Sequence, residues 1–464
     1  MTFRHPAFAG RIGFARADIT PPLTVYARNW GAAEHDRAES VHRPLTLSAM
    51  VITDDNSQPK LVLIEGDLSW WRELDTWHRF RDLLLASIGI PPQSLIFSLT
   101  HSHASPPLMQ APDSGLPGAG ELAQWVDDVR SQAEQLVTTA ASTAVDCLME
   151  WHTGSCRLAN NRDFPDPTSN GTRNLCGFHP HAESDSTLLV GRVTDRAGVV
   201  RAILVNYACH PTTLAFGNRS LSPDFVGAMR ATIEQHVTGA SAFFLQGASG
   251  ELAPRHQYTG DTSVADRHGE QLGHAVLATL ADMEPPGTEL AFEKSVESGA
   301  PLAVWQHRSR TSFPKQVSAS IRLVSLPLKQ WPTSHQLQAE LERCDDRALR
   351  ERITRRLAVR RALGDGETFA MPVSLWRTGD ILWVGSMAES YSLLQRSLRR
   401  RFPRFAVVCL NLINGSIGYL PPAELYGSDL YQVWQTPFAR GSLESVIRAI
   451  ETHIEGMQRA ESSK

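Results

Sequence analysis

The chain has 464 residues, of which 42% are hydrophobic and 20% are charged, and its formal net charge is -4. These values are typical of a soluble globular protein, and the slightly acidic balance argues against a nucleic-acid partner. No segment approaches the ~18 apolar residues that are needed to cross a bilayer. The first residues also lack an apolar segment of the signal-peptide type, so we expect a cytoplasmic protein with no integral membrane segment.

The first hundred residues predict an extended arm followed by two strands. Residues 1–45 are rich in proline, glycine and polar side chains, and we expect them to lie as an arm on the core. Residues 60–67 and 94–100 are apolar runs typical of buried strands. The second run ends at His101 and His103, whose imidazoles would share one face if the segment stays extended.

The middle of the chain alternates between helix and strand signals. Residues 121–149 carry apolar side chains at helical spacing. Residues 188–209 predict a hairpin that ends at His210, and a helix over 224–236 and a strand over 242–245 follow. This alternation predicts an α/β (α+β) fold in which mixed β-sheets are flanked by helices.

The composition changes in the last third of the chain. Residues 330–368 are dense in arginine, glutamate and alanine. We interpret them as a charged helical excursion on the surface, and a lid or a partner helix is the alternative. Apolar strands are then expected at 381–388, which ends at Glu389, and at 405–412, which leads to Tyr419.

Two histidines, one glutamate and one tyrosine thus follow four distant strands, the positions where α/β proteins usually place ligand chemistry. A mononuclear zinc hydrolase requires such a donor set. Each residue also has a plainer interpretation on its own. His210 would be a hydrogen-bonded core residue, and Glu389 would be a carboxylate favoured by a helix N-terminus. Cys209 is interpreted as a core thiol rather than a metal ligand.

Several short motifs occur in a fixed order along the chain. They are Thr100-His101-Ser102-His103, Asn161-Arg162, Cys209-His210-Pro211-Thr212, Gly250-Glu251-Leu252-Ala253-Pro254, Glu389 and Gly418-Tyr419. Together they resemble the catalytic domain of the neutral (non-lysosomal) ceramidases. The resemblance runs from about Ile12 to the C-terminus, so it implies one catalytic domain over residues 1–464.

The resemblance implies a role for each matched residue. The zinc ligands of the family map to His101, His210, Glu389 and Tyr419. The second histidine of its H-T-H-S-G-P tract, which works in catalysis, maps to His103, an acid and base here. Arg162 and Tyr431 match a family arginine and a second functional tyrosine, and both are expected to stabilise the oxyanion or to orient the substrate. The implied cofactor is Zn²⁺.

The chain also departs from the family pattern. The family hexapeptide G-D-V-S-P-N holds a serine where this chain has Ala253, so a serine acyl-enzyme at this position is excluded. Ala388 replaces a glycine, and Leu420-Pro421-Pro422 replaces I-T-T. The family's secretion signal and its immunoglobulin-like domain are not expected in this chain.

The function expected from these residues is hydrolysis of an amide bond in a small or lipid-like N-acyl substrate by a zinc-activated water. An esterase or a lactonase on the same zinc scaffold is one alternative, and a non-catalytic zinc protein is another. The expected cytoplasmic location favours a soluble amide over a membrane sphingolipid as the substrate. The sequence does not indicate an oligomeric state. Asp67 and Asp224 are expected to hold the ligand histidines, with helix capping as the alternative for Asp224.

Overall fold

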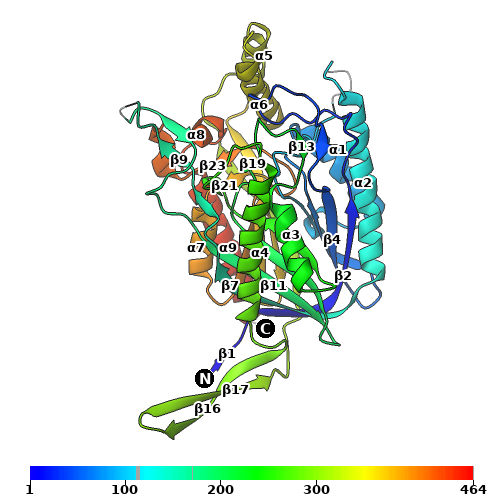
Figure 1. The fold of residues 1–464 in the computed structure, drawn as a ribbon, viewed down its shortest axis with the longest axis vertical. Helices are drawn as coiled ribbons and strands as arrows, with labels where there is room; N and C mark the ends of the chain where they lie inside the picture. The colour runs from blue at the N-terminus through cyan, green and yellow to red at the C-terminus, as the bar shows by residue number, and fades with distance from the viewer. Residues whose placement is uncertain (111–114, 170, 463–464) are drawn as a thin grey trace.

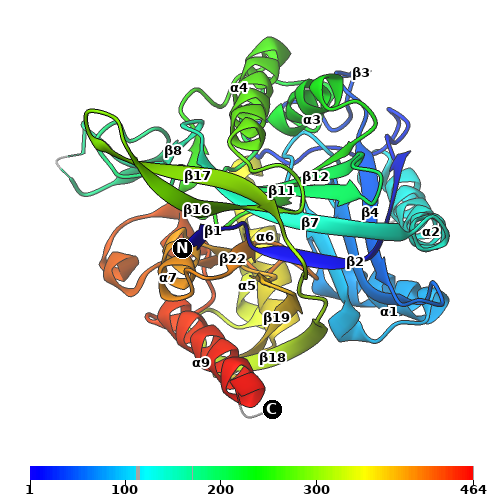
Figure 2. The same ribbon diagram turned by 90° about the horizontal axis from the view of Figure 1, so that it is seen from below.

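Two mixed β-sheets packed face to face form the centre of the protein (Figures 1 and 2). The structure, a computed structural model, describes residues 1–110, 115–169 and 171–462. The larger sheet has the order β14-β12-β11-β7-β2-β4-β5-β6. Its strands are β2 (Ala7–Asp18), β4 (Thr46–Thr53), β5 (Pro59–Gly66), β6 (Leu95–Leu99), β7 (Val145–Ser155), β11 (Thr187–Asp195), β12 (Val200–Tyr207) and β14 (Ser241–Gln246).

The smaller sheet has the order β18-β19-β20-β22. Its strands are β18 (Val317–Pro327), β19 (Thr368–Thr378), β20 (Ile381–Ser386) and β22 (Ala406–Leu410). The two sheets share an apolar interior in which Trp151 of β7 meets Trp383 of β20 edge to face, with ring centroids 5.6 Å apart. The larger sheet includes two parallel strand pairs and the smaller sheet includes one, so the predicted mixed sheets are confirmed.

Helices cover the outer faces of both sheets, which gives a layered helix–sheet–sheet–helix arrangement (Figure 2). Strand side chains alternate between faces, so one face of β12 packs in the interior between the sheets and the other packs under α3 and α4. The covering helices are α1 (Leu74–Ile88), α2 (Ala119–Ser142), α3 (Phe225–His236), α4 (Thr262–Ala281), α7 (Leu393–Arg401) and α9 (Ser442–Ser462). Within the described residues, no helix is both long and apolar enough to span a membrane.

The N-terminal region differs from the expected arm. Residues 7–18 form β2, a central strand between β7 and β4. Phe8 and Ile12 are buried between the sheets on one face of this strand, but Gly10 and Gly13 interrupt its apolar alternation. Gly13 also touches the backbone of α2, because a Cβ atom there would lie 1.7 Å from the carbonyl oxygen of Ala140. The glycines that make the segment look like a loop therefore allow close packing.

The helix expected over 121–149 ends earlier than predicted. The helix α2 stops at Ser142, and Val145 begins β7. The apolar spacing continues past Ser142 because buried residues of β7 follow directly, so spacing alone does not show where the helix gives way to the strand.

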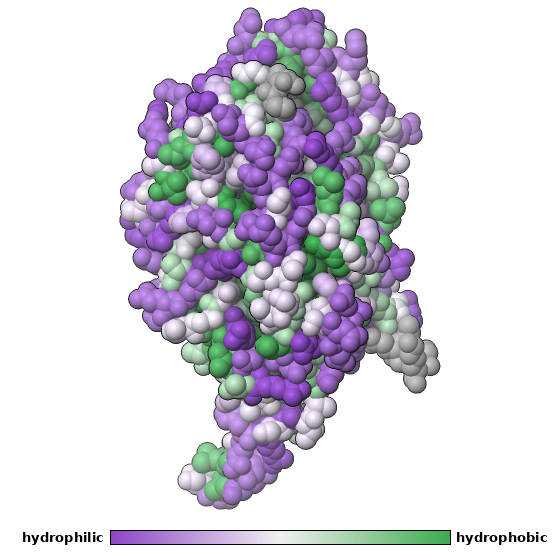
Figure 3. Space-filling view, turned by 90° about the vertical axis from the view of Figure 1, so that its right-hand side faces the viewer, coloured by the Kyte–Doolittle hydropathy of each residue, from purple (hydrophilic) through white to green (hydrophobic). Residues whose placement is uncertain are grey.

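Several short elements complete the fold. They are β1 (Thr2–Phe3), β3 (Ser40–Val41), β8 (Ala159–Asn161), β9 (Asp163–Pro165), β10 (Asn174–Cys176), β13 (Ser220–Leu221), β15 (Leu252–Pro254), β21 (Glu389–Ser390), β23 (Tyr419–Leu420), η1 (Pro92–Ser94), η2 (Ala423–Gly427) and α8 (Tyr431–Gln435). A hairpin of β16 (Thr288–Glu297) and β17 (Pro301–Ser309) pairs with β1 and projects from the body as a narrow extension (Figures 1 and 3).

The charged excursion folds as two helices, α5 (Ser334–Glu342) and α6 (Arg347–Leu363), at the end of the molecule opposite that hairpin (Figure 1). Thr333 and Gln336 form a capping box at the start of α5, and the carboxylate of Asp346 accepts a hydrogen bond from the Leu349 amide to cap α6. One face of α6 buries Ile353 and Leu357, so this helix is not solvated on all sides.

Candidate metal and catalytic site

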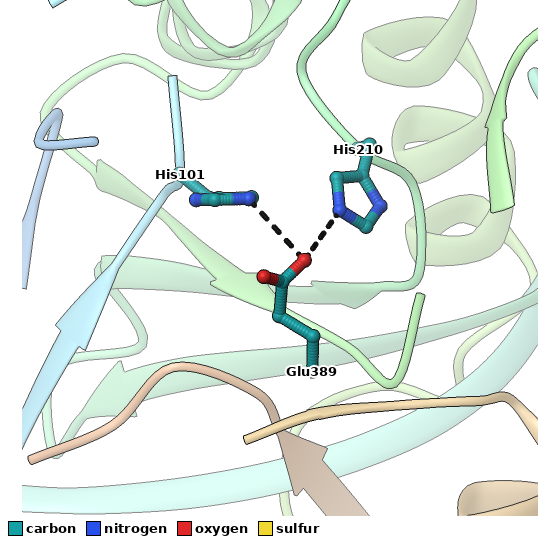
Figure 4. Close-up of side chains that lie close together, drawn as sticks. All are labelled: His101, His210 and Glu389. Atoms are coloured by element: carbon teal, nitrogen blue, oxygen red, sulfur yellow. Dashed lines mark hydrogen bonds and ion pairs between the residues drawn. The ribbon is translucent and has the colours of Figure 1, made fainter. Parts of the chain in front are cut away.

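Three potential metal ligands from distant strands meet in one place (Figure 4). His101 follows β6, His210 follows β12, and Glu389 follows β20 and begins β21. One nitrogen from each histidine and one carboxylate oxygen of Glu389 all lie within 4.8 Å of one another. The large sheet curls so that β6 contacts β14 near the opposite edge, which brings the ends of β6 and β12 together.

Backbone carbonyls fix the tautomer of both histidines. Nδ1 of His101 donates to the carbonyl oxygen of Ser69 at 3.0 Å, and Nδ1 of His210 donates to that of Leu252 at 3.2 Å. In both rings Nε2 then faces Oε2 of Glu389, at 3.5 Å and 2.8 Å. Three acceptor atoms directed at one point fit a bound cation, and two imidazoles with one carboxylate form a donor set that zinc accepts.

The electrostatics of the three residues agree with this fit. Burial, followed by the nearby Arg162, lowers the pKa of His210 to about 4. The ring is therefore neutral at pH 7 and can donate an electron pair to a metal ion. Burial raises the pKa of Glu389, but the two histidines outweigh that effect and hold this pKa well below its usual value. The carboxyl group is therefore ionised, and no proton has to leave these two side chains before a metal ion can bind.

Asp67 and Asp224 were expected to hold the two histidines, but they bind other groups, so that prediction is wrong. Both oxygens of Asp67 accept from the buried Arg230, at 3.0 and 2.8 Å. Asp224 accepts from the amides of Phe225 and Leu214, as the helix-capping alternative predicts. Backbone carbonyls take the place of these carboxylates beside the two imidazoles.

Tyr419 and Arg162 lie beside the cluster formed by His101, His210 and Glu389. The parallel pairing of β21 with β23 aligns Tyr419 with Glu389. The Arg162 guanidinium donates to the Tyr419 hydroxyl at 3.2 Å, to Nε2 of His210 at 3.2 Å and to the carbonyl oxygen of Gly250 at 2.8 Å. Burial and then Glu389 raise the pKa of Tyr419 well above its ordinary value, so the phenol keeps its proton unless a cation displaces it.

His103 lies beside the cluster on its open side. Its Nε2 is 3.3 Å from Nε2 of His101, and its ring lies between Trp30 and Trp70 with centroid distances of 5.0 Å to each. Burial and then His101 hold the pKa of His103 well below its usual value, so the ring is a neutral base at pH 7. The two imidazoles converge because His101 adopts a left-handed backbone with φ of 68°, and not through the extended geometry expected from their spacing.

Tyr431 completes the predicted set. It begins α8, and its ring lies 5.7 Å from that of Tyr419. Its hydroxyl forms a hydrogen bond with Arg355 of α6. The structure therefore brings together all seven residues named from the sequence, although their individual roles remain predictions.

A cavity of about 560 Å³ opens onto this cluster. His101, His103, Glu389, Tyr419 and Tyr431 contribute to its floor. Apolar side chains form one wall, namely Trp70, Trp71, Leu74, Met109, Leu116 and Ile417. A stripe of residues on α6 also lines the cavity, so the surface-helix interpretation describes only part of this element.

The glycine-rich segment after β14 supports the site without supplying a nucleophile. Ala253 is 1% exposed and pairs with Asn160 in the antiparallel ladder of β15 and β8. Gly250 lies against the candidate metal ligands, where a Cβ atom would come within 3.0 Å of the carbonyl oxygen of Glu389. Cys209 is buried in the core under α3, as expected, and burial raises the pKa of its thiol.

Sequence reasoning missed the arginines of the cavity wall. Arg355 of α6 and Arg72, which precedes α1, both line the cavity. The cavity-lining residues of α6 are Arg347, Arg350, Glu351, Thr354, Arg355, Ala358, Val359 and Ala362. These residues recur at steps of three and four, which is one stripe of a helix, and this spacing was the available signal.

Comparison with known proteins shows the same fold in solved ceramidases. No family model and no curated protein sequence matches the chain. A structure described as a ceramidase complexed with C2 has a TM-score of 0.66 and 14% identity, and the neutral ceramidase of Pseudomonas aeruginosa has a TM-score of 0.67 and 15% identity. Each match covers 96% of this chain and 74% of the other. At this identity the likeness establishes the fold, and the resemblance expected from the motifs is confirmed at that level.

Proposed function

We propose that this protein is a zinc-dependent hydrolase that cleaves the amide bond of an N-acyl substrate. One observation carries the proposal. Two imidazole nitrogens and a carboxylate oxygen converge on the floor of a cavity, and a histidine, an arginine and two tyrosines surround them. The ceramidase fold supports an amide as the bond that is cleaved.

His101, His210, Glu389 and Tyr419 would hold the zinc ion. Bound zinc supplies Lewis acidity, which brings the pKa of a coordinated water to about 7 and polarises a carbonyl group. Tyr419 joins the ligand set only by losing its proton, and the adjacent guanidinium of Arg162 favours the phenolate.

His103 is the residue we assign to proton transfer. Its ring is neutral at pH 7 and lies next to His101, so it can accept a proton from the attacking water through Nε2. The same nitrogen then returns this proton to the departing amine nitrogen as the C–N bond breaks. Trp30 and Trp70 confine the ring and keep Nε2 directed at the cluster.

Tyr431 and Arg162 are assigned to the developing negative charge. Burial raises the pKa of Tyr431, so its hydroxyl remains a hydrogen-bond donor. Arg162 is buried and donates to atoms of the cluster itself, so it stabilises added negative charge there.

The test is hydrolysis of a panel of N-acyl amides of graded acyl length by zinc-loaded protein, with matched esters in parallel. We expect amide cleavage in the wild type and a fall of about 10²- to 10⁴-fold in kcat for His103→Gln, with zinc content unchanged. His181→Gln, at an exposed position outside the cavity, serves as the control. Full activity of His103→Gln would contradict the assignment of His103 to proton transfer. Cleavage of esters alone would show that the substrate is an ester and not an amide.

A further inference from the structure

The arginines of the cavity wall indicate what else the substrate carries. The helix α6 contains seven arginines and one glutamate in 17 residues. Of these arginines, Arg347, Arg350 and Arg355 line the cavity, and Arg28 and Arg72 face it from the N-terminal part of the chain. A wall of this kind is unusual beside an apolar cavity and calls for an anionic ligand.

The carboxylates near these arginines are shared between pairs. Arg72 and Arg355 both contact Oε1 of Glu351, at 3.3 and 3.2 Å. Arg28 and Arg347 likewise both contact Oδ1 of Asp36, at 3.4 and 3.5 Å. In each group two guanidinium ions share one carboxylate, so one positive charge is left over.

The inner group matters most, because it is withheld from solvent. The side chains of Arg72 and Glu351 are only 11% and 12% exposed, and that of Arg355 is 25% exposed. Among the described residues, the buried Nε of Arg72 has no hydrogen-bond partner. The charges of Asp345, Arg347 and Arg350 are exposed, so the solvent screens them strongly.

The inner group also lies close to the proposed catalytic groups. Arg355 lies over the Trp70 ring at 5.1 Å and bonds to the Tyr431 hydroxyl. The same Trp70 ring lies 5.0 Å from the ring of His103. One tryptophan ring therefore contacts both the guanidinium of Arg355 and the group that would protonate the leaving amine.

The opposite end of the α6 stripe is apolar. Ala358, Val359 and Ala362 continue the cavity lining along α6 beyond Arg355. Along α6 the cavity lining thus changes from arginines to apolar side chains, and the candidate metal ligands His101 and Glu389 line the same cavity. This polarity matches an amphiphile that has an acyl chain on one side of the scissile bond and a charged group on the other.

Resting on the proposed amidase function, we propose that the amine part of the substrate carries an anionic group, a carboxylate or a phosphate, which Arg72 and Arg355 bind. An N-acyl amino acid or an N-acyl aminoalkyl phosphate has this chemistry, whereas a ceramide is neutral. Water adds to the acyl carbon and the C–N bond breaks. A fatty acid and an amine that retains the anionic group are released, and the proton of the water goes to the amine nitrogen.

The experiment compares matched pairs of soluble substrates on zinc-loaded protein. N-decanoylglycine is paired with its neutral amide, and N-decanoyl phosphoethanolamine with N-decanoylethanolamine. We expect kcat/KM to favour the anionic member of at least one pair by about 30-fold, because each charged contact contributes as a charge-assisted hydrogen bond. The pair that shows the preference identifies the anion as carboxylate or phosphate.

Variants then assign the preference to the arginines rather than to the metal. Arg72→Gln and Arg355→Gln should bring the anionic-to-neutral ratio close to one, mainly through KM, and Arg355→Lys should restore part of it. Arg361→Gln, on the exposed side of the same helix, should leave the ratio unchanged. A ratio near one in the wild type, or a ratio retained in both glutamine variants, overturns this inference.

Failure of the proposed function is distinguishable from failure of this inference. Cleavage of the neutral and anionic members at equal rates supports the amidase function and contradicts the anionic substrate. If no member of either pair is cleaved, the proposed amidase function is wrong, and calorimetric binding of the same pairs then tests the anionic preference. Tighter binding of the anionic member that is lost in Arg355→Gln supports it, and equal binding of both members overturns it.

Discussion

Nε2 of His210 lies 2.8 Å from Oε2 of Glu389, although the Leu252 carbonyl keeps the ring proton on the opposite nitrogen. Two acceptor atoms at this distance repel each other unless a cation lies beside them. Arg162 approaches the histidine from one side, and Nε2 of His101 also lies 3.5 Å from the same carboxylate oxygen. This relationship is the physical basis of the metal assignment.

Removing the Tyr431 hydroxyl should slow the reaction without emptying the site. We expect Tyr431→Phe to lower kcat by about 100-fold, because one oxyanion donor contributes about 3 kcal/mol to the transition state. Steady-state kinetics at constant zinc occupancy measures the effect. Tyr426→Phe is the matched control, because its hydroxyl donates to the Phe438 carbonyl outside the cavity. A kcat within threefold of wild type would show that Tyr431 plays no part in charge stabilisation.

Gly250 should be required for the geometry of the metal ligands. A Cβ atom there would lie 2.6 Å from the Tyr391 ring and 3.0 Å from the carbonyl oxygen of Glu389. We expect Gly250→Ala to weaken zinc binding at least tenfold and to destabilise the fold by about 1–3 kcal/mol. Gly120→Ala, at a helical position with open space around it, is the control and should not weaken zinc binding. Wild-type zinc affinity in Gly250→Ala, measured with a competing chelator, would contradict the account.

Glu251 should make stability depend on pH. Burial raises the pKa of its carboxyl group to about 7 from 4.5, and hydrogen bonds from Ser392 only partly oppose this rise. Between these pH values the folded chain keeps a proton that the unfolded chain releases, so stability falls as the pH rises. Glu251→Gln lacks this proton, so its stability relative to wild type should rise by about 3 kcal/mol from pH 4.5 to 7 and then stay level.

Thermal and denaturant unfolding at a series of pH values tests the Glu251 prediction. The constant cost of altering the hydrogen bonds to Ser392 shifts the whole comparison and does not change its slope with pH. Glu121→Gln, at an exposed position of α2, should run parallel to wild type. A pH-independent difference between Glu251→Gln and wild type would show that the folded carboxyl titrates normally.

The strand ends were readable from the sequence because long apolar runs stop abruptly at polar residues. The runs before His101, His210 and Glu389 are the buried strands β6, β12 and β20. Such runs have few conformations that bury them fully, so local pattern and final structure agree. The meeting of the three ends was not readable from periodicity, since it depends on the curl of the large sheet.

The predictions that failed depend on contacts between residues that are far apart in the sequence. Asp67 has the expected carboxylate chemistry, but the buried Arg230 of α3 needs a counter-ion and takes it. The cavity-lining side of α6 was not recognised from the sequence, because its arginines dominate the local composition and indicate a solvated helix. Only the packing of α6 over the cavity shows that Arg355 is part of the site.

Zinc binding by the wild-type protein and by His210→Ala tests the central claim most directly. Untagged protein is dialysed to equilibrium against buffered zinc, and the metal is then measured by elemental analysis. We predict about one zinc ion per chain in the wild type and in the exposed-site control His181→Ala, and none held tightly by His210→Ala. A wild-type chain that takes up no zinc, or a His210→Ala chain that retains one equivalent, would contradict the account.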